Sequence, residues 1–318
     1  MSERRRVVLD TDMGSDVDDA LALALALASP EIDLVAVTHV TRDTRLRAAI
    51  SRKLLDLAGR TEVPVYAGRS AVHGGDDQRF SWFGNEGKGI LEAGERPAVA
   101  PEDAIDALER LADREAGLEI VAVGPMTNLA AVLTRRPELA RRISCLTIMG
   151  GHIREVAYRG HVFSPGVDYN LCSDPGAALI VLGAGIPTRL VTADVTLQTW
   201  MTAADRERFA ASRSPLVGAL ARAIRHWTPI MRDIFGNLGG HIEADNAAFL
   251  HDPLALASVF DESFCRFEDL EIEAAMVDGL FRTIERPRAS ERTRTLRCAT
   301  AVDGERFRAW FVERVLRL

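Results

Sequence analysis

The chain has 318 residues, 47% of them hydrophobic and 27% charged, with a formal net charge of −7. This composition is typical of a folded globular protein, and the acidic balance argues against a nucleic-acid partner. The longest apolar stretch, residues 20–28, is too short to cross a membrane. The four cysteines form no metal-binding or redox motif, and no signal sequence opens the chain. We therefore expect a soluble cytoplasmic protein without nucleic-acid or membrane partners.

Strand and helix patterns alternate over the first 195 residues. A β-rich run at 6–11 is followed by a Leu/Ala segment at 18–28, which lacks β-branched residues and is apolar on all sides, as a buried helix is. Further strands are predicted at 32–40, 64–68, 118–124, 144–151 and 187–195. Further helices are predicted at 45–59, 102–115, 127–136 and 174–185.

The remainder of the chain is less regular. Residues 196–250 are predicted to be mainly helical, a helix follows His251, and strands are predicted near 270–277 and 295–302 before an amphipathic helix at 304–318. The alternation predicts an α/β fold: an open, mostly parallel (mixed) sheet flanked by helices, in a single Rossmann-like domain over residues 1–318. Ligands of such sheets bind at the carboxyl ends of the strands, so we expect the functional residues there.

An acidic cluster follows the first strand. Five aspartates fall within ten positions, between the strand and the buried helix: Asp10, Asp12, Asp16, Asp18 and Asp19. Their mutual repulsion is severe in a crevice of low dielectric and is removed by a divalent cation, for which hard oxygen donors favour Ca²⁺ or Mg²⁺. An EF-hand is excluded, because its glycine and glutamate positions hold Ser15 and Leu21. Asp16 alone is interpreted as a solvated loop residue or a helix cap.

A second interpretation of the cluster is a Mg²⁺-dependent phosphatase of the haloacid dehalogenase type, which begins with a strand and a DxDx[TV] motif. The segment Asp10–Gly14 supplies both aspartates but has glycine where that motif requires Thr or Val. The chain has only two lysines, Lys53 and Lys88, and neither follows a strand as the phosphate-binding lysine would. This interpretation stays open as the alternative.

The order of several short motifs resembles the inosine–uridine preferring nucleoside hydrolase family, whose members begin with a strand and DxDxGxDDA. Here the motif is Asp10–Gly14 followed, after two extra residues, by Asp18–Ala20. The other matching motifs follow in the right order: AVGPMTNLA (122–130), MGG (149–151), DYN (168–170) with DP (174–175), and HDPLA (251–255). The resemblance covers nearly the whole chain and implies hydrolysis of the N-glycosidic bond of a nucleoside or a related N-ribosyl compound.

The resemblance also implies roles for individual residues. The Ca²⁺ ligands would be Asp12, Asp19, the backbone carbonyl of Val123 and Asp252. Asp12 would accept a proton from the attacking water, and His251 would assist the leaving base, which would sit in an aromatic slot with candidate walls at Phe83, Trp227 and Phe235. The substrate-binding residues would be Asp18, Asp43, Met149, Asp168 and Asn170. Family members are commonly dimers or tetramers, so we expect a homo-oligomer.

The sequence departs from the family pattern mainly around the sugar and the base. Asp43 stands in place of a ribose-binding asparagine, Val162 in place of a second pocket asparagine, and Phe83 in place of a histidine. These changes predict a modified substrate preference, while the intact cation ligands argue against a protein that only binds its ligand and has lost turnover. The loops expected to contact the base, near 75–90 and 225–250, carry no pattern that distinguishes purine from pyrimidine.

Overall fold

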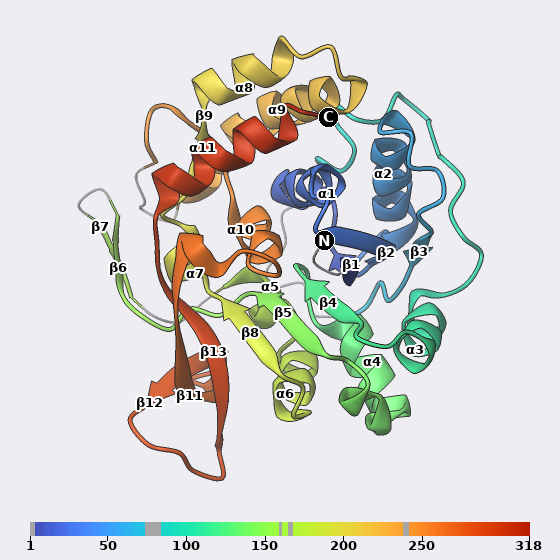
Figure 1. The fold of residues 1–318 in the computed structure, drawn as a ribbon. Coiled ribbons are helices and arrows are strands. Elements are labelled where there is room, and N and C mark those ends of the chain that lie inside the picture. The colour runs from blue at the N-terminus through green and yellow to red at the C-terminus, as the bar shows by residue number, and fades with distance from the viewer. Residues whose placement is uncertain (1–3, 74–83, 159–160, 165–167, 238–241) are drawn as a thin grey trace.

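The computed structural model describes residues 4–73, 84–158, 161–164, 168–237 and 242–318. Its centre is a nine-stranded sheet with the order β12-β11-β13-β8-β5-β4-β1-β2-β3 (Figure 1). In chain order these strands are β1 (Arg5–Thr11), β2 (Ile32–His39), β3 (Val65–Ala67), β4 (Glu119–Ala122), β5 (Cys145–Met149), β8 (Thr188–Val191), β11 (Cys265–Val277), β12 (Leu280–Arg286) and β13 (Thr293–Val302). Two small pairs accompany the sheet: β6 (Val156–Tyr158) with β7 (His161–Phe163), and β9 (Trp200–Thr202) with β10 (Asn246–Phe249).

The sheet is mostly parallel. The seven strands from β13 to β3 run in one direction, whereas β11 is antiparallel to both of its neighbours. The strands β2 and β3 extend the sheet from one side of β1, and β4, β5 and β8 extend it from the other. The chain order therefore reverses between β1 and β4, the position at which open α/β sheets bind ligands. The predicted fold class is confirmed.

Helices cover both faces of the sheet (Figure 1). One face packs against α1 (Asp18–Ala28), α2 (Thr44–Leu57), α9 (Pro215–Asn237), α10 (His251–Ala257) and α11 (Gly304–Val315). The other face packs against α3 (Ala104–Arg114), α4 (Thr127–Arg135) and α6 (Pro175–Gly183). The remaining helices are α5 (Tyr169–Ser173), α7 (Ala193–Thr196), α8 (Ala203–Ala210) and two short 3₁₀ turns at Pro137–Arg141 and Glu262–Phe264.

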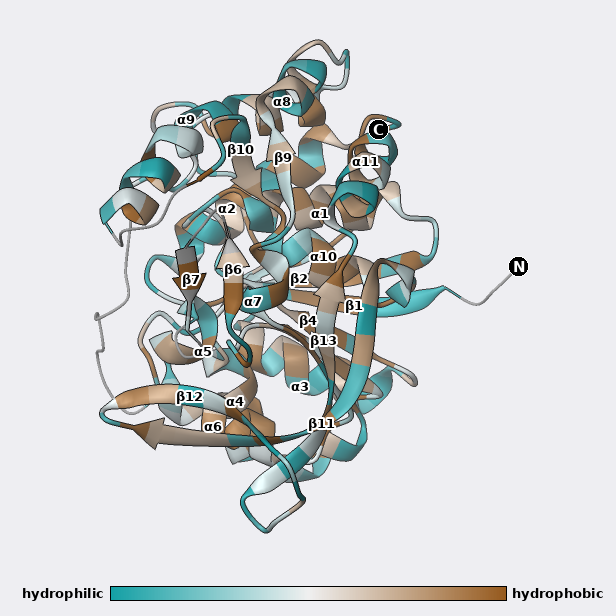
Figure 2. Ribbon diagram, turned by 90° about the vertical axis from the view of Figure 1, so that its left-hand side faces the viewer, coloured by the Kyte–Doolittle hydropathy of each residue, from teal (hydrophilic) through white to brown (hydrophobic). Residues whose placement is uncertain are grey.

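The side chains of β1 explain why two layers of helices are needed. Val7 and Leu9 are fully buried in the core on the α1 side, and Val8 is fully buried in the core on the α4 side. Alternate residues of a strand point to opposite faces, so a strand that is apolar throughout must be covered twice. The hydrophilic residues lie instead on the outer turns of helices such as α8 and α11 (Figure 2). No helix of the described residues is both long and apolar enough to cross a membrane.

The structure differs from the predicted elements in several places, and no element was predicted where β6, β7 and α5 lie. The strand predicted at 187–195 ends at Val191, and residues 193–196 form α7 instead. The region predicted to be mainly helical contains α8 and α9 but also the strands β9 and β10. The strand predicted near 270–277 is part of β11, but β12 was missed, although Asp278 and Gly279 between the two strands take φ values of 50° and 78°. An Asp-Gly pair with positive φ at both positions is a common two-residue hairpin turn.

Candidate active site

A cavity of about 240 Å³ lies at the carboxyl end of the parallel strands, where the chain order reverses between β1 and β4. The ends of β1, β4 and β5 and the segments after them supply one part of its lining. The helices α5, α9 and α10 supply most of the remainder. Topology thus marks this cavity as the candidate active site.

The loop between β1 and α1 brings four aspartates to the cavity: Asp12, Asp16, Asp18 and Asp19. Carboxylate oxygens of Asp16, Asp18 and Asp19 lie within 4.8 Å of one another. Thr11 Oγ1 donates a hydrogen bond to Asp19, and the backbone N–H of Asp18 donates one of 3.1 Å to Asp16 Oδ1. The start of α1 also favours nearby negative charge through the helix dipole. These local contacts orient the carboxylates but leave most of their charge unneutralised.

Two further oxygen donors come from distant segments. Asp252 lies in the first turn of α10, and Val123 directly follows β4; both line the same cavity. The carbonyl oxygen of Val123 accepts a hydrogen bond of 2.9 Å from Asn170 Nδ2. A carbonyl oxygen has two lone pairs, so this bond is compatible with a second contact. The acidic cluster therefore faces oxygen donors on two other elements.

Burial raises the pKa values of these carboxyl groups. The pKa of Asp252 is well above its ordinary value, first because of burial and second because of the charges of Asp19, Asp16 and Asp12. The pKa of Asp19 is raised in the same way, and that of Asp16 is raised to about 8, by burial and then by the charge of Asp12. The β1–α1 loop and the start of α10 line one cavity, so their carboxylates lie close enough to affect one another.

Among the residues that the structure describes, the carboxylates are accompanied by one buried cationic side chain. Arg47, on α2, is 1% exposed and its charge lowers the pKa values of Asp12, Asp16 and Asp19. Its guanidinium donates to backbone carbonyls rather than to these carboxylates. One positive charge against five aspartates leaves a large negative excess in a buried site. Carboxylate and carbonyl oxygens in this number are a donor set suited to Ca²⁺ or Mg²⁺.

The other side of the cavity is apolar. Four residues spaced along one face of α9 line it, together with Phe249 of β10: Trp227, Met231, Ile234 and Phe235. The His251 ring lies 5.1 Å from the Phe249 ring, and His251 Nδ1 is 2.6 Å from Thr196 Oγ1. Burial lowers the pKa of His251 to about 4, so the ring is neutral at pH 7. The cavity thus joins an acidic half to an aromatic half.

Comparison with known proteins identifies the family. Residues 7–309 match the sequence profile described as inosine-uridine preferring nucleoside hydrolase. The chain belongs to this family. Nucleoside hydrolases are N-glycosyl hydrolases, and the phosphatase interpretation is therefore not favoured.

Individual relatives agree with the family assignment. The pyrimidine-specific ribonucleoside hydrolase RihA of Citrobacter koseri is 34% identical over 262 residues, which are 79% of this chain and 78% of the relative. The probable uridine nucleosidase 2 of Arabidopsis thaliana is 30% identical over 278 residues, 82% of this chain and 79% of the relative. A purine-preferring ribonucleoside hydrolase from Gardnerella vaginalis superposes with a TM-score of 0.82 at 27% identity over 98% of each chain. The plant nucleoside hydrolase PpNRh1 has the same fold, with a TM-score of 0.85 at 24% identity over 99% of each chain.

Nine of the ten predicted site residues line the cavity of this nucleoside hydrolase: Asp12, Asp18, Asp19, Val123, Met149, Asp168, Asn170, His251 and Asp252. Asn170 Nδ2 donates to the carbonyls of Val123 and Met149, at 2.9 and 3.0 Å, which fixes the orientation of its amide. Asp168 Oδ1 accepts a hydrogen bond of 2.8 Å from the backbone of Leu171, and burial raises the pKa of Asp168 to about 6. The structure thus brings these nine residues together from five segments of the chain.

Asp43 is the exception. It is exposed and lies at the N-terminal cap of α2, where its Oδ1 accepts a hydrogen bond of 2.9 Å from the backbone of Leu46. It does not line the cavity, so the structure gives it a capping role in place of the predicted contact with substrate. Val162 is 56% exposed and also lies outside the lining. Phe83 falls outside the described residues.

Sequence reasoning missed three contributors to the site. Asp16 does accept a backbone hydrogen bond as a cap would, but it also lines the cavity with the other aspartates. Ser15 lines the cavity from the same loop, in the stretch that is longer than the family motif. Arg47 was not among the predicted site residues, although it stands among the buried positions of α2. A charged residue on the apolar face of an amphipathic helix was the available signal.

Proposed function

We propose that this nucleoside hydrolase cleaves the N-glycosidic bond of ribonucleosides, or of a related N-ribosyl compound, and releases ribose and the free base. The observation that carries the proposal is the joining of an acidic half and an aromatic half in one cavity. A nucleoside has the matching halves, because its hydroxyl-rich sugar suits polar groups and its flat base suits an apolar slot.

The acidic half fits a divalent cation, for which we propose Ca²⁺. Asp12, Asp19, Asp252 and the carbonyl of Val123 would hold it, and Asp16 is a further oxygen donor at the same cluster. Donors from three separate segments suit the flexible coordination of Ca²⁺ better than the strict octahedron of Mg²⁺. When bound, the cation would offset the carboxylate charge, hold neighbouring sugar hydroxyls and lower the pKa of a water beside it.

The sugar would be bound by Asp18, Asp168 and Asn170. The Nδ2 of Asn170 is occupied by two backbone carbonyls, so its Oδ1 is the atom left to accept a hydrogen bond from a hydroxyl. Asp168 is held by its cap contact to Leu171 and can accept a second hydroxyl. Met149 would form an apolar contact beneath the ring. Fixed acceptors of this kind orient the sugar before the bond is broken.

The reaction needs a base for the water and a site for the leaving group. Asp12 would accept the proton of the water that attacks C1′, as the bond to the base lengthens and the sugar takes on oxocarbenium character. The base would leave along the apolar face of α9, where Trp227 and Phe235 exclude water. His251 Nε2 would hydrogen-bond the departing base and stabilise its developing negative charge, since Nδ1 is engaged by Thr196.

The test is an assay of the purified protein with uridine, inosine and a nucleotide monoester, each with and without EDTA. Reducing sugar and inorganic phosphate are both measured. We expect release of sugar from at least one nucleoside, loss of that activity in EDTA, and recovery with Ca²⁺. Release of phosphate would favour the phosphatase, and no release of either product would indicate a binding protein. Hydrolysis unaffected by EDTA would contradict the proposed cation.

A further inference from the structure

Ser15 connects the loop of Asp12 to α2. Its side chain is 4% exposed, and its Oγ donates a hydrogen bond of 3.2 Å to Asp12 Oδ2. Arg47 Nη2 donates a hydrogen bond of 2.9 Å to the same Ser15 Oγ. Asp12 and Arg47 are therefore joined through one hydroxyl group.

The direction of these bonds is fixed by the groups themselves. A guanidinium can only donate, so Ser15 Oγ must be the acceptor from Arg47. Tyr169 is also hydrogen-bonded to Ser15, and because Ser15 donates its hydrogen to Asp12, its second lone pair must accept from the Tyr169 hydroxyl. The single hydrogen of Ser15 is then available to the carboxylate of Asp12, which as an anion can only accept. The chain of bonds consequently runs from Arg47 through Ser15 to Asp12.

Arg47 is itself held in one place. Its Nη1 donates to the carbonyls of Asp12 and Met13, the latter at 3.0 Å, and its Nε donates to the carbonyl of Thr41 at 2.8 Å. The guanidinium thus ties the loop after β1 to the loop after β2. Arg47 does not line the cavity and cannot reach the substrate from this position. Any effect it has on the reaction must pass through the groups that it holds.

We propose that Arg47 and Ser15 are positioning residues that fix the rotation of the Asp12 carboxylate, with Arg47 acting through Ser15. One oxygen of Asp12 is engaged by Ser15, so the other is presented to the cation and the attacking water. This role rests on the proposed function, in which Asp12 is the base.

The experiment is a double-mutant cycle of Ser15→Ala, Arg47→Met and the double variant. The values of kcat and KM are measured at saturating Ca²⁺. Ser15→Ala should lower kcat by about ten- to a hundred-fold, the effect of losing one hydrogen bond to a charged group. KM should change by less than about threefold, and Ser15→Thr, which keeps the hydroxyl, should recover most of the rate. The double variant should be no slower than Arg47→Met alone, because both changes remove the same interaction.

Two controls distinguish a misplaced Asp12 carboxylate from a loss of the folded state. Ser51→Ala, on α2, removes a buried hydroxyl that contacts His39 rather than Asp12, and it should leave kcat unchanged. Melting temperatures of all variants show whether Arg47→Met folds; if it does not, Arg47→Lys takes its place in the cycle. An unchanged kcat in Ser15→Ala would overturn the positioning role. So would a double variant whose loss of kcat equals the product of the losses in the two single variants. A wild-type protein without hydrolysis would instead overturn the proposed function and this role with it.

Discussion

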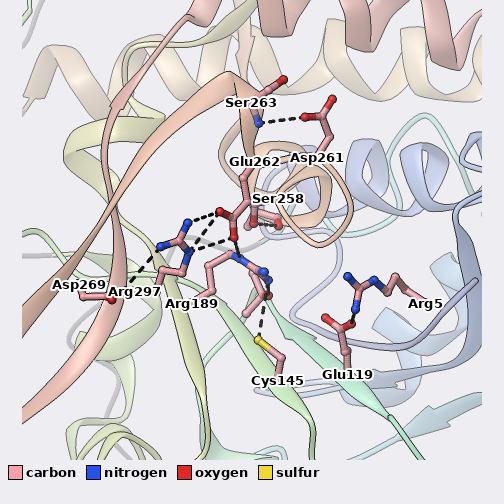
Figure 3. Close-up of polar contacts among 12 residues, drawn as sticks. Arg5, Glu119, Cys145, Arg189, Ser258, Asp261, Glu262, Ser263, Asp269 and Arg297 are labelled. Atoms are coloured by element: carbon pink, nitrogen blue, oxygen red, sulfur yellow. Dashed lines mark hydrogen bonds and ion pairs between the residues drawn. The ribbon is translucent and has the colours of Figure 1, made fainter. Parts of the chain in front are cut away.

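The carboxylates at the two ends of the parallel sheet have different surroundings. Near the amino end, two glutamates lie beside arginines. Figure 3 shows Glu262 with Arg189 and Arg297, and Glu119 with Arg5. At the carboxyl end, six aspartates line one cavity, and the buried cation beside them, Arg47, donates to backbone carbonyls and to Ser15. The same sheet thus carries one edge with paired charges and one with a negative excess.

The pKa values record this difference. A hydrogen bond from Arg297 lowers the pKa of Glu262, and Arg189 lies 3.0 Å from the same carboxylate. Burial and neighbouring negative charges raise the pKa of Asp252 at the other end. At the amino end, Glu262 is therefore stabilised in its ionised form, although burial outweighs the effect of Arg5 and raises the pKa of Glu119. At the carboxyl end, no described cationic side chain bonds to the carboxylates of the aspartates that line the cavity, and Arg47 donates to other groups. An arrangement that opposes folding persists where it serves function, which is why the cavity and not the salt-bridge cluster marks the active site.

The largest expected effect comes from removing a carboxylate at the carboxyl end. Asp12→Asn should lower kcat by about 10²- to 10⁴-fold, the usual contribution of a general base, and more if cation binding also weakens. The melting temperature of the cation-free variant should not fall, because the substitution removes a buried negative charge. Glu119→Gln, which alters a buried carboxylate at the amino end, is the matched control and should keep wild-type kcat. Activity of Asp12→Asn within about threefold of wild type would remove Asp12 from the mechanism.

An effect of intermediate size on the stability of the folded state is expected when the pH is changed in the absence of divalent cations. The folded state binds protons on Asp16, Asp19 and Asp252 more tightly than the unfolded chain does, and the pKa of Asp16 is about 8. The unfolded chain releases these protons near pH 4, so the stability of the folded state falls as pH rises from about 4 to about 8. Since one pKa unit corresponds to about 1.4 kcal/mol, the melting temperature in EDTA should drop by about 5 °C or more between pH 5 and 8.

Calcium should abolish this pH dependence. A bound cation replaces the protons, so saturating CaCl₂ should raise the melting temperature most at pH 8 and least at pH 5. Scanning calorimetry in EDTA and in CaCl₂ at both pH values measures the difference. A melting temperature that rises with pH in EDTA, or that ignores Ca²⁺ at pH 8, would refute the view that the carboxyl end lacks a cationic partner.

Much of the fold could be predicted because its parallel core is periodic. The all-apolar segment of α1 and the strands β1, β2 and β4 were predicted to within three residues at each end, since each combines strong propensity with a clear boundary. The region after residue 196 was harder. The strands β9 and β10 have three and four residues and pair with each other outside the main sheet, so their formation depends on tertiary contacts that no local pattern records.

The site residues that belong to sequence motifs could be predicted. Those whose role depends on contacts between distant segments could not be predicted. Asp12, Asp19 and Asp252 belong to recognisable sequence motifs, and the structure places all three at the cavity. Asp43 was assigned by its position after the second strand, but the capping interaction at the start of α2 decides its orientation. Arg47 reaches the carbonyl of Asp12 from a residue 35 positions away. Such a contact depends on how α2 packs against the β1–α1 loop, which sequence spacing alone does not give.

The smallest expected effect comes from removing the charge of a glutamate at the amino end of the sheet. Glu262→Gln should lower the free energy of unfolding at pH 7 by about 1 kcal/mol, because the glutamate is partly exposed but leaves the mostly buried Arg189 without its ion pair. The stabilisation by Glu262 depends on its charge and its folded pKa is lowered, so the difference from wild type should disappear as pH falls below about 4. Urea unfolding at pH 7 and pH 3.5 measures both values. The kcat of this variant should equal that of the wild type; a large loss of turnover with an intact fold would show that the two ends of the sheet are not separate in function.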